Sequence, residues 1–147
     1  MKLIAENKKA YHDYEITEKL EAGIVLAGSE IKSIRMGKIN LKDSYCLIKN
    51  GELFLLGAHI STYEKTSSFA PDPTRTRKLL VHKAELGKLE RKTKIKGFSL
   101  VPLRVYLERG LAKIEIGIAK GKREFEKRDA IKNREIKREI ERSLKEN

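Results

Sequence analysis

The stretch Leu100–Ala119, LVPLRVYLERGLAKIEIGIA, contains the clearest strand pattern in the chain and decides the fold. Apolar residues alternate with polar ones in both halves, which predicts half-buried β-strands over residues 100–107 and 111–119. Glu108–Gly110 separates the two halves and predicts a tight hairpin turn. On the buried face, the pattern places Val101, Leu103, Val105 and Leu107 of the first strand and Ile114, Ile116 and Ile118 of the second.

Shorter strands are predicted upstream of this hairpin. The patterns indicate strands over residues 14–20, 21–27, 43–48 and 52–56. The dipeptide Asn50–Gly51 joins the last two, and Asn-Gly is a strong hairpin signal. Residues 61–78 have no period, which predicts a long loop of functional importance or a disordered segment.

Two short helices are predicted between the strands. The first begins near Gly28 with Ser29 as its N-cap, and Gly37 can take the left-handed conformation beyond its end. Ile31 and Ile34 should point into the core. The second covers residues 83–92, with Leu86 and Leu89 facing inward. Antiparallel strands with small inserted helices favour a mainly β protein built as a closed barrel rather than a layered α/β sheet.

The C-terminal residues 120–147 form a basic tail beyond the predicted body, which covers residues 1–119. The tail has a thin apolar stripe at Ile136, Ile140 and Leu144. Such a stripe buries little surface, so an isolated helix here is marginal in water. We therefore predict that the tail becomes helical on a polyanion and that residues 128–147 make few contacts with the body. The alternative is a solvated helix docked on the body.

Net charge is the first functional signal. The chain of 147 residues carries a formal charge of +12 and has an isoelectric point near 9.8. An excess of this size favours a nucleic acid or an anionic membrane surface as partner. A surface rich in ion pairs, as in thermophiles, would explain many charges of both signs but not the excess.

The sequence also limits location and redox chemistry. Cys46 is the single cysteine and lies in an apolar run, so a disulfide or a zinc cluster within one chain is excluded. No signal peptide or apolar run of 18 residues occurs. We expect a soluble, cytoplasmic protein without contact to membranes.

Catalytic motifs are missing from the sequence. The three histidines, His12, His59 and His82, do not have metal-ligand spacing, and no nucleotide-binding or nucleophile motif is present. A two-metal nuclease site with ligands far apart in the chain stays open. We expect no catalytic residue, no metal and no cofactor.

Two groups of residues suit RNA instead. His12 lies in a basic, aromatic segment that suits phosphate contact and base stacking, although an ordinary exposed N-terminus would look similar. Lys32 and Arg35 lie three residues apart on the first predicted helix and form a small basic face.

Long motifs over nearly the whole chain resemble one family. They are NKKAYHDYEI (Asn7–Ile16), EAGIVLAGSEIKSIRMGKINLKDSY (Glu21–Tyr45), GEL and HI within Gly51–Ile60, DPTRTRKLL (Asp72–Leu80), KGFSLVPL (Lys96–Leu103) and KIEIGIAKGKREFEKRDAIK (Lys113–Lys132). Together they resemble small protein B (SmpB), the bacterial partner of transfer-messenger RNA. The resemblance implies a closed antiparallel β-barrel of the oligonucleotide-binding type with two or three embedded helices.

The resemblance also implies a function in trans-translation. The body would bind the tRNA-like domain of transfer-messenger RNA and deliver it to stalled ribosomes together with elongation factor Tu. The tail would occupy the empty mRNA channel and the decoding centre of the small subunit, so that the nascent chain is tagged. We expect a monomer and no enzymatic activity.

Site residues follow from the matched motifs. The resemblance implies RNA contacts by Asn7, Lys8, Lys9, His12, Tyr14, Glu21, Lys32, Arg35, Arg75, Arg77 and Lys78. It implies ribosome contacts by the tail residues Lys122, Arg123, Lys127, Arg128, Ile131 and Lys132. Among them, Glu21 would accept hydrogen bonds, His12 would face the decoding centre, and the lysines and arginines would neutralise phosphates. The chain has Glu126 where the family's tail has aspartate, which puts the contact of that side chain in doubt.

The residue patterns alone do not exclude two other functions. One is a general ribosomal protein or initiation-type factor with an oligonucleotide-binding fold, which would bind structured RNA without preference for a tRNA-like domain. The other is an RNA-processing hydrolase, which would cleave RNA in the presence of a divalent metal.

Overall fold

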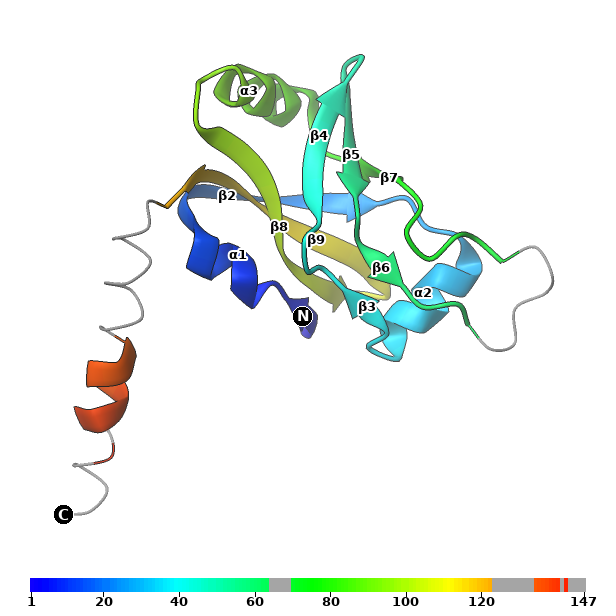
Figure 1. The fold of residues 1–147 in the computed structure, drawn as a ribbon. Coiled ribbons are helices and arrows are strands. Elements are labelled where there is room, and N and C mark those ends of the chain that lie inside the picture. Colours follow the sequence, from blue (N-terminus) through cyan, green and yellow to red (C-terminus); the bar gives the residue numbers. More distant parts are fainter. Residues whose placement is uncertain (64–69, 123–133, 141, 143–147) are drawn as a thin grey trace.

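The predicted hairpin forms strands β8 (Phe98–Glu108) and β9 (Leu111–Gly121) in the computed structural model, which describes residues 1–63, 70–122, 134–140 and 142 (Figure 1). Ile114, Ile116 and Ile118 are fully buried, as predicted. Positive φ angles at Arg109 (52°) and Gly110 (78°) make the tight turn of a two-residue hairpin.

Six strands of the described chain form a ring. The remaining strands are β1 (Lys2–Glu6), β2 (Tyr14–Ile24), β3 (Ile39–Asn40), β4 (Tyr45–Lys49), β5 (Glu52–Leu56), β6 (His59–Ile60) and β7 (Arg77–Leu80). The sheet order is β1-β8-β4-β5-β7-β2-β9, and β9 pairs back with β8, so β1 lies outside the ring. These pairings are antiparallel, and β3 pairs separately with β6. The prediction of a mainly β, antiparallel fold is therefore confirmed.

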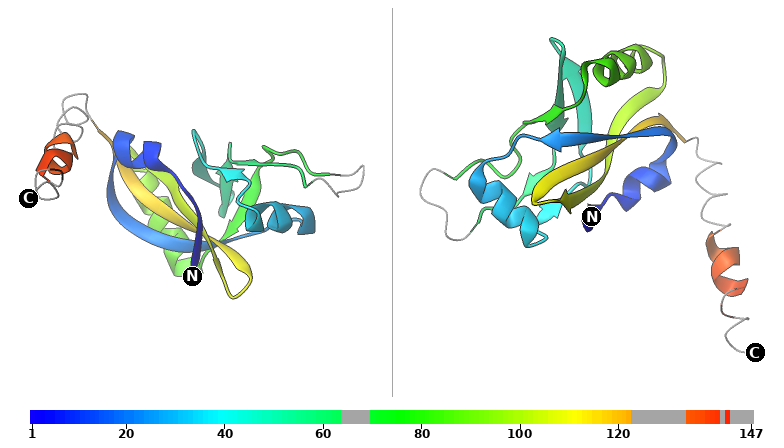
Figure 2. Two further views of the ribbon diagram at one scale, coloured as in Figure 1. Left: turned by 90° about the horizontal axis from the view of Figure 1, so that it is seen from below. Right: turned by 180° about the vertical axis from the view of Figure 1, so that it is seen from behind.

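Three short helices accompany the strands: α1 (Lys8–Asp13), α2 (Gly28–Arg35) and α3 (Lys83–Thr93). The predictions of α2 and α3 are confirmed, with Ile34 and Leu89 fully buried. The predicted cap of α2 is wrong, because the N-cap is Ala27, whose N–H donates to the Glu30 carboxylate at 2.9 Å. Helix α1 was not predicted. α1 and α2 lie at opposite ends of β2 (Figure 2).

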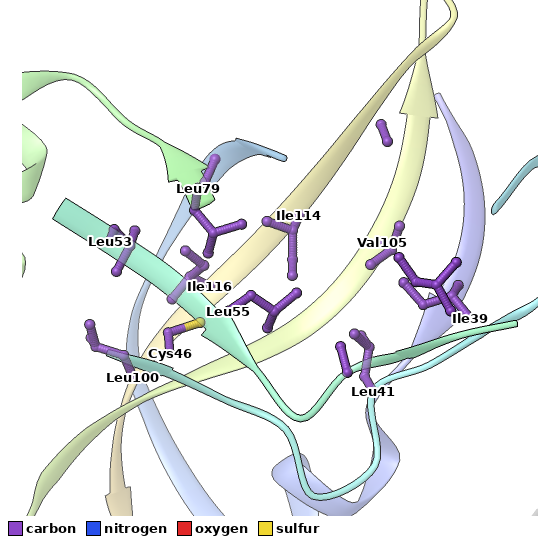
Figure 3. Packing of buried hydrophobic residues seen from close by; sticks show 14 of the residues in the cluster. Ile39, Leu41, Cys46, Leu53, Leu55, Leu79, Leu100, Val105, Ile114 and Ile116 are labelled. Atoms are coloured by element: carbon purple, nitrogen blue, oxygen red, sulfur yellow. The ribbon is translucent and has the colours of Figure 1, made fainter. Parts of the chain in front are cut away.

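The core fills the inside of the ring. It joins side chains from every strand of the ring, including Leu53 and Leu55 of β5, Leu79 of β7, and Ile114 and Ile116 of β9 (Figure 3). Cys46 lies in this core, as predicted, and burial raises the pKa of its thiol to about 12. At neutral pH the thiol therefore stays protonated and behaves as a small apolar side chain.

A β-bulge changes the predicted faces of β8. The register shifts between Pro102 and Arg104, so Val101 and Leu103 lie in a second, smaller cluster beneath α1, whereas Val105 lies in the main core. The expectation that these three residues share one face is wrong, because the extra residue of a bulge reverses the alternation. A Cβ atom added at Gly117 would lie 2.9 Å from Cδ1 of Leu103, so this glycine leaves room for the cluster.

The chain before α2 is one strand rather than two. β2 runs without a break from Tyr14 to Ile24 and pairs with β9 over most of its length. Exposed side chains alternate with less exposed ones from Tyr14 to Ala22, so the predicted break between residues 20 and 21 is wrong.

Candidate nucleic-acid interface

Glu21 lies at a polar cluster where three strands of the ring meet. It comes from β2, and the phenol of Tyr106 on β8 donates a hydrogen bond to its Oε2. Nζ of Lys113 on β9 lies 4.0 Å from its Oε1. Burial, followed by the hydrogen bond to Glu21, raises the pKa of Tyr106, so the phenol stays a donor at neutral pH. Glu21 is therefore fixed by a neighbour, while its side chain is still 47% exposed.

A shallow pocket of about 340 Å³ opens beside Glu21. Lys113 and Leu80 line it together with Glu85 at the start of α3. Leu80 is 54% exposed although it follows the buried Leu79, because successive side chains of a strand point to opposite faces. The pocket thus offers an acceptor, a cation and an apolar surface within one concave patch.

The sequence interpretation missed Lys113, Leu80 and Tyr106. A signal existed for two of them, because the two-residue turn of the hairpin sets Tyr106 directly opposite Lys113. The contact between Tyr106 and Glu21 joins residues 85 positions apart, and no local pattern reveals such a pairing.

Asn7, one of the predicted RNA contacts, lies at the start of α1 with its side chain buried. It is 6% exposed and caps α1, accepting the N–H of Ala10 at 3.2 Å. Its amide donates to the carbonyl oxygens of Pro102 at 2.9 Å and Leu41 at 3.4 Å. Asn7 therefore holds α1 against β8.

Helix α1 presents the other predicted residues of the N-terminal cluster. Lys8 is exposed, and Nζ of Lys9 lies 2.5 Å from Oδ1 of Asp43. Their hydrogen bond raises the pKa of Lys9 and lowers that of Asp43. Nδ1 of His12 lies 2.9 Å from Oδ1 of Asp13. Lys8 thus faces solvent, whereas Lys9 and His12 each contact a carboxylate.

The side chain of Tyr14 and the start of the tail lie beside α1. Tyr14 is half-buried and packs against the second cluster, so only part of its ring is accessible. The backbone N–H of Lys122 donates to the carbonyl oxygen of Asp13 at 2.9 Å, and its Nζ donates to that of Tyr11 at 3.2 Å. The first residue of the predicted ribosome-contacting set is thereby attached to α1.

A second basic surface lies at α2. Lys32 and Arg35 are exposed, as the helical spacing predicts, and Nζ of Lys32 lies 5.5 Å from the centroid of the Tyr63 ring. Lys78 on β7 is also exposed, with its Nζ 3.5 Å from Oε1 of Glu52. These cations remain accessible to phosphates.

Arg77, another predicted phosphate contact, is fully buried. Its guanidinium donates to Glu30, Ala58 and Pro73. The Glu30 carboxylate also accepts hydrogen bonds from Arg75, whose side chain is 33% exposed. Burial alone would raise the pKa of Glu30, but the bonds from Arg75, the Ala27 N–H and Arg77 outweigh it and lower that pKa.

Most of the predicted tail contacts lie outside the described residues, namely Arg123, Lys127, Arg128, Ile131 and Lys132. Within the described part of the tail, Ile136 is 47% and Ile140 56% exposed. The prediction that this apolar stripe is not buried against the body is confirmed for these two residues.

The described part of the chain contains neither a candidate metal cluster nor a candidate membrane helix. Within residues 1–63, 70–122, 134–140 and 142, no group of three or more His, Cys, Asp or Glu side chains could hold a metal ion. None of the helices in that part of the chain is long and apolar enough to cross a membrane.

Comparison with known proteins assigns the family. The family model described as "SmpB protein" matches residues 4–146. An "SsrA-binding protein" of Shouchella clausii is 56% identical over 145 residues, covering 99% of this chain and 93% of the relative. One of Sulfurihydrogenibium sp. is 56% identical over 144 residues, covering 98% and 95%.

A solved structure gives the same assignment. A chain from the study "tmRNA-SmpB: a journey to the center of the bacterial ribosome" is 47% identical, with a TM-score of 0.69, and the match covers 86% of this chain and 93% of that one. The family model matches nearly the whole sequence of this chain, and the structural match covers most of its fold. The chain therefore belongs to the SmpB family.

Proposed function

We propose that this protein binds the tRNA-like domain of transfer-messenger RNA and works with that RNA in ribosome rescue. Its family consists of non-enzymatic RNA-binding proteins, and its relatives are named SsrA-binding proteins. One observation locates the RNA-binding surface. The Glu21 carboxylate is held by Tyr106 and lies beside Lys113 at the rim of a concave patch.

This patch suits an RNA surface that presents both donors and a phosphate. A carboxylate accepts hydrogen bonds from base amino groups and ribose hydroxyls, and an ammonium neutralises a phosphate. Exposed Leu80 supplies apolar contact to a base or ribose. Glu21 would repel a plain phosphate backbone, so the patch favours a folded RNA that brings a donor to this point.

Phosphate contacts at the α2 end extend the same interface. We assign them to Lys32, Arg35 and Lys78, with Arg75 contributing through its exposed part. Arg77 and Asn7 support the surface from inside the fold and do not contact RNA. This division follows their burial, since Arg77 is fully buried and Asn7 is only 6% exposed.

The ribosome is the second partner in this proposal. The α1 surface, with Lys8, Lys9 and His12, faces the decoding centre, and the part of the tail that follows Lys122 occupies the empty mRNA channel as a helix. Elongation factor Tu accompanies the RNA during delivery. In this arrangement residues 1–119 act as the RNA-binding body, and the protein works as a cytoplasmic monomer.

We infer that the six-stranded ring is a closed barrel of the oligonucleotide-binding type. The return pairing of β9 onto β8 supports closure. The long β2, β8 and β9 also carry the three polar members of the Glu21 cluster, as expected when a barrel wall serves as a binding face.

A competition experiment tests the RNA assignment. Labelled tRNA-like domain is bound to the full chain and displaced with unlabelled domain or with a hairpin RNA of equal length. We expect the domain to compete far more strongly, and Glu21→Gln to weaken its binding by about 1–3 kcal/mol. Glu108→Gln, an exposed carboxylate at the end of β8, is the matched control. Equal competition by the hairpin would favour a general RNA-binding factor.

Removing residues 123–147, which leaves β9 complete, tests the separate roles of body and tail. We expect the shortened chain to keep its affinity for the tRNA-like domain and to lose tagging of nascent chains on stalled ribosomes. Normal tagging without the tail would contradict the proposed place of the tail in the mRNA channel.

A further inference from the structure

A row of charged side chains crosses the outer wall of the ring, where β9 pairs with both β2 and β8. Glu115 of β9 lies opposite Arg104 of β8 on one side and opposite Glu21 of β2 on the other. Side chains of directly opposite residues in antiparallel strands share a face, with Cβ atoms about 4.5–5.5 Å apart. Two carboxylates therefore lie next to each other, and one of them belongs to Glu21.

Arg104 neutralises the second carboxylate. Its Nη2 lies 2.7 Å from Oε2 of Glu115 and its Nε 3.3 Å from Oε1, so the guanidinium binds both oxygens, the strongest geometry for such a pair. The Glu115 side chain is only 15% exposed. Nζ of Lys19 lies 3.9 Å from the same carboxylate. Arg104 is thus the closest cation to Glu115 in the described chain.

An uncompensated charge on Glu115 would disturb the Glu21 cluster in two ways. Like charges directly opposite each other in a sheet repel, so Glu21 would be pushed away from its place. Glu115 would also attract Lys113 and the phenol of Tyr106, which occupy the next row of the same face and contact Glu21. The geometry of the cluster therefore requires a cation at Glu115.

The other charged and titratable groups near this row do not replace Arg104. Glu6 of β1 lies opposite Arg104 on its far side and adds negative charge. Glu85 and His82 line the pocket beside Glu21, which adds another carboxylate there. Lys19 is half exposed, and its Nζ also lies 5.5 Å from the centroid of the Tyr11 ring.

We propose that Arg104 is a positioning residue for the RNA contact of Glu21. By neutralising Glu115, it lets Glu21 remain beside Tyr106 and Lys113 in the orientation that accepts a hydrogen bond from RNA. Arg104 itself does not contact RNA. The inference rests on the proposed function and adds a residue that is absent from the RNA contacts assigned above.

Binding of labelled tRNA-like domain to the full chain tests the proposal. Arg104→Gln should weaken binding about 5- to 50-fold, within the loss expected for Glu21→Gln. Arg104→Lys keeps the positive charge and should retain most of the affinity. Arg91→Gln, which removes an exposed arginine of α3, is the matched control and should bind like the parent chain.

Second-site variants separate positioning from a structural role. Arg104→Gln should have less than about a twofold effect when it is introduced into Glu115→Gln or into Glu21→Gln, because the repulsion then no longer exists. The double variant of Arg104 and Glu115 contains no uncompensated charge from this pair. It therefore tests the proposal even where Arg104→Gln alone is unstable, and circular dichroism reports the fold of each variant.

Salt dependence separates positioning from direct contact. Arg104→Gln should leave the slope of log affinity against log salt unchanged, whereas a lost phosphate contact would lower it by about 0.7–0.9. A lower slope, or an equal loss in the Glu115→Gln background, would overturn the proposal. So would normal binding by a folded Arg104→Gln chain while Glu21→Gln binds weakly. Normal binding by Glu21→Gln would instead overturn the proposed function, and this inference with it.

Discussion

Nε of Arg77 lies 2.8 Å from Oε2 of Glu30, and this buried contact fastens the N-terminus of α2 to β7. Arg77 is fully buried and Glu30 is 4% exposed. Arg75 adds a second guanidinium to the same carboxylate. The basic motif around residues 72–80 is thus partly a structural device that sets the position of α2, and with it the position of Lys32 and Arg35.

Replacing Glu30 with glutamine should strongly destabilise the fold. The change removes one partner of a buried ion pair and leaves the Arg77 charge uncompensated, which costs about 3–5 kcal/mol of unfolding free energy. Urea denaturation measures the loss. Glu52→Gln, which removes an exposed partner of Lys78, should cost less than about 1 kcal/mol. Equal small effects would show that the Glu30 cluster is not important for stability.

The stability contributed by Glu30 should depend on pH in a defined direction. Its pKa is lowered in the fold, so its contribution is complete above the unfolded pKa of about 4.3 and is lost as pH falls through the folded pKa. The difference in unfolding free energy between the parent chain and Glu30→Gln should therefore be constant from pH 7 to pH 5 and shrink below. A difference that grows in acid would contradict the lowered pKa.

Tyr106→Phe should weaken RNA binding through Glu21. The substitution keeps the ring in place but removes the hydroxyl that holds the carboxylate, so Glu21 loses its fixed orientation. The affinity for the tRNA-like domain should fall in the parent background and remain unchanged in the Glu21→Gln background. Equal losses in both backgrounds would show that Tyr106 acts independently of Glu21.

Gly117→Ala should destabilise the second cluster without removing a contact. The new methyl group would lie 2.9 Å from Cδ1 of Leu103, and overpacking of this kind costs about 1–3 kcal/mol. Thermal or urea denaturation measures the loss, and a further Leu103→Ala change should lessen the effect of the added methyl. Gly121→Ala is the matched control, since no atom of the described chain lies within 4 Å of its added Cβ.

Lys32→Gln combined with Arg35→Gln should flatten the salt dependence of RNA binding. Each lost phosphate contact lowers the slope of log affinity against log salt by about 0.7–0.9. Lys49→Gln, an exposed cation at the end of β4, is the control and should leave the slope unchanged. An unchanged slope in the double variant would mean that the α2 surface does not contact phosphates.

The sequence predicted the elements of this fold better than their faces. The isoleucines of β9 alternate without interruption, so their burial follows directly from the pattern. β8 carries Pro102, and a proline inside a strand is typical of an edge or a bulge. That signal was present, yet only the register with β9 shows that the faces reverse at this point.

The sequence predicted only part of the candidate site, because contacts between distant residues leave no local pattern. Exposed Lys32 and Arg35 follow from helical spacing alone. Arginine is rarely buried, so a basic loop predicts exposed cations, and the burial of Arg77 depends on Glu30, which lies 47 residues away. Asn7 likewise precedes a basic stretch. Its amide donates to the carbonyl oxygens of Leu41 and Pro102, which are distant in the sequence, so its burial could not be predicted.

Strand β9 carries a geometric consequence for how the two ends of the molecule cooperate. It begins near Lys113 at the Glu21 pocket and ends at Gly121, next to the Lys122 backbone that is bonded to α1. Eight residues of extended chain separate these points by about 26 Å. Because β9 pairs with the two long strands β2 and β8, this separation is fixed by the body. If RNA binds at the Glu21 pocket as proposed, Lys122 lies at a set distance from that RNA.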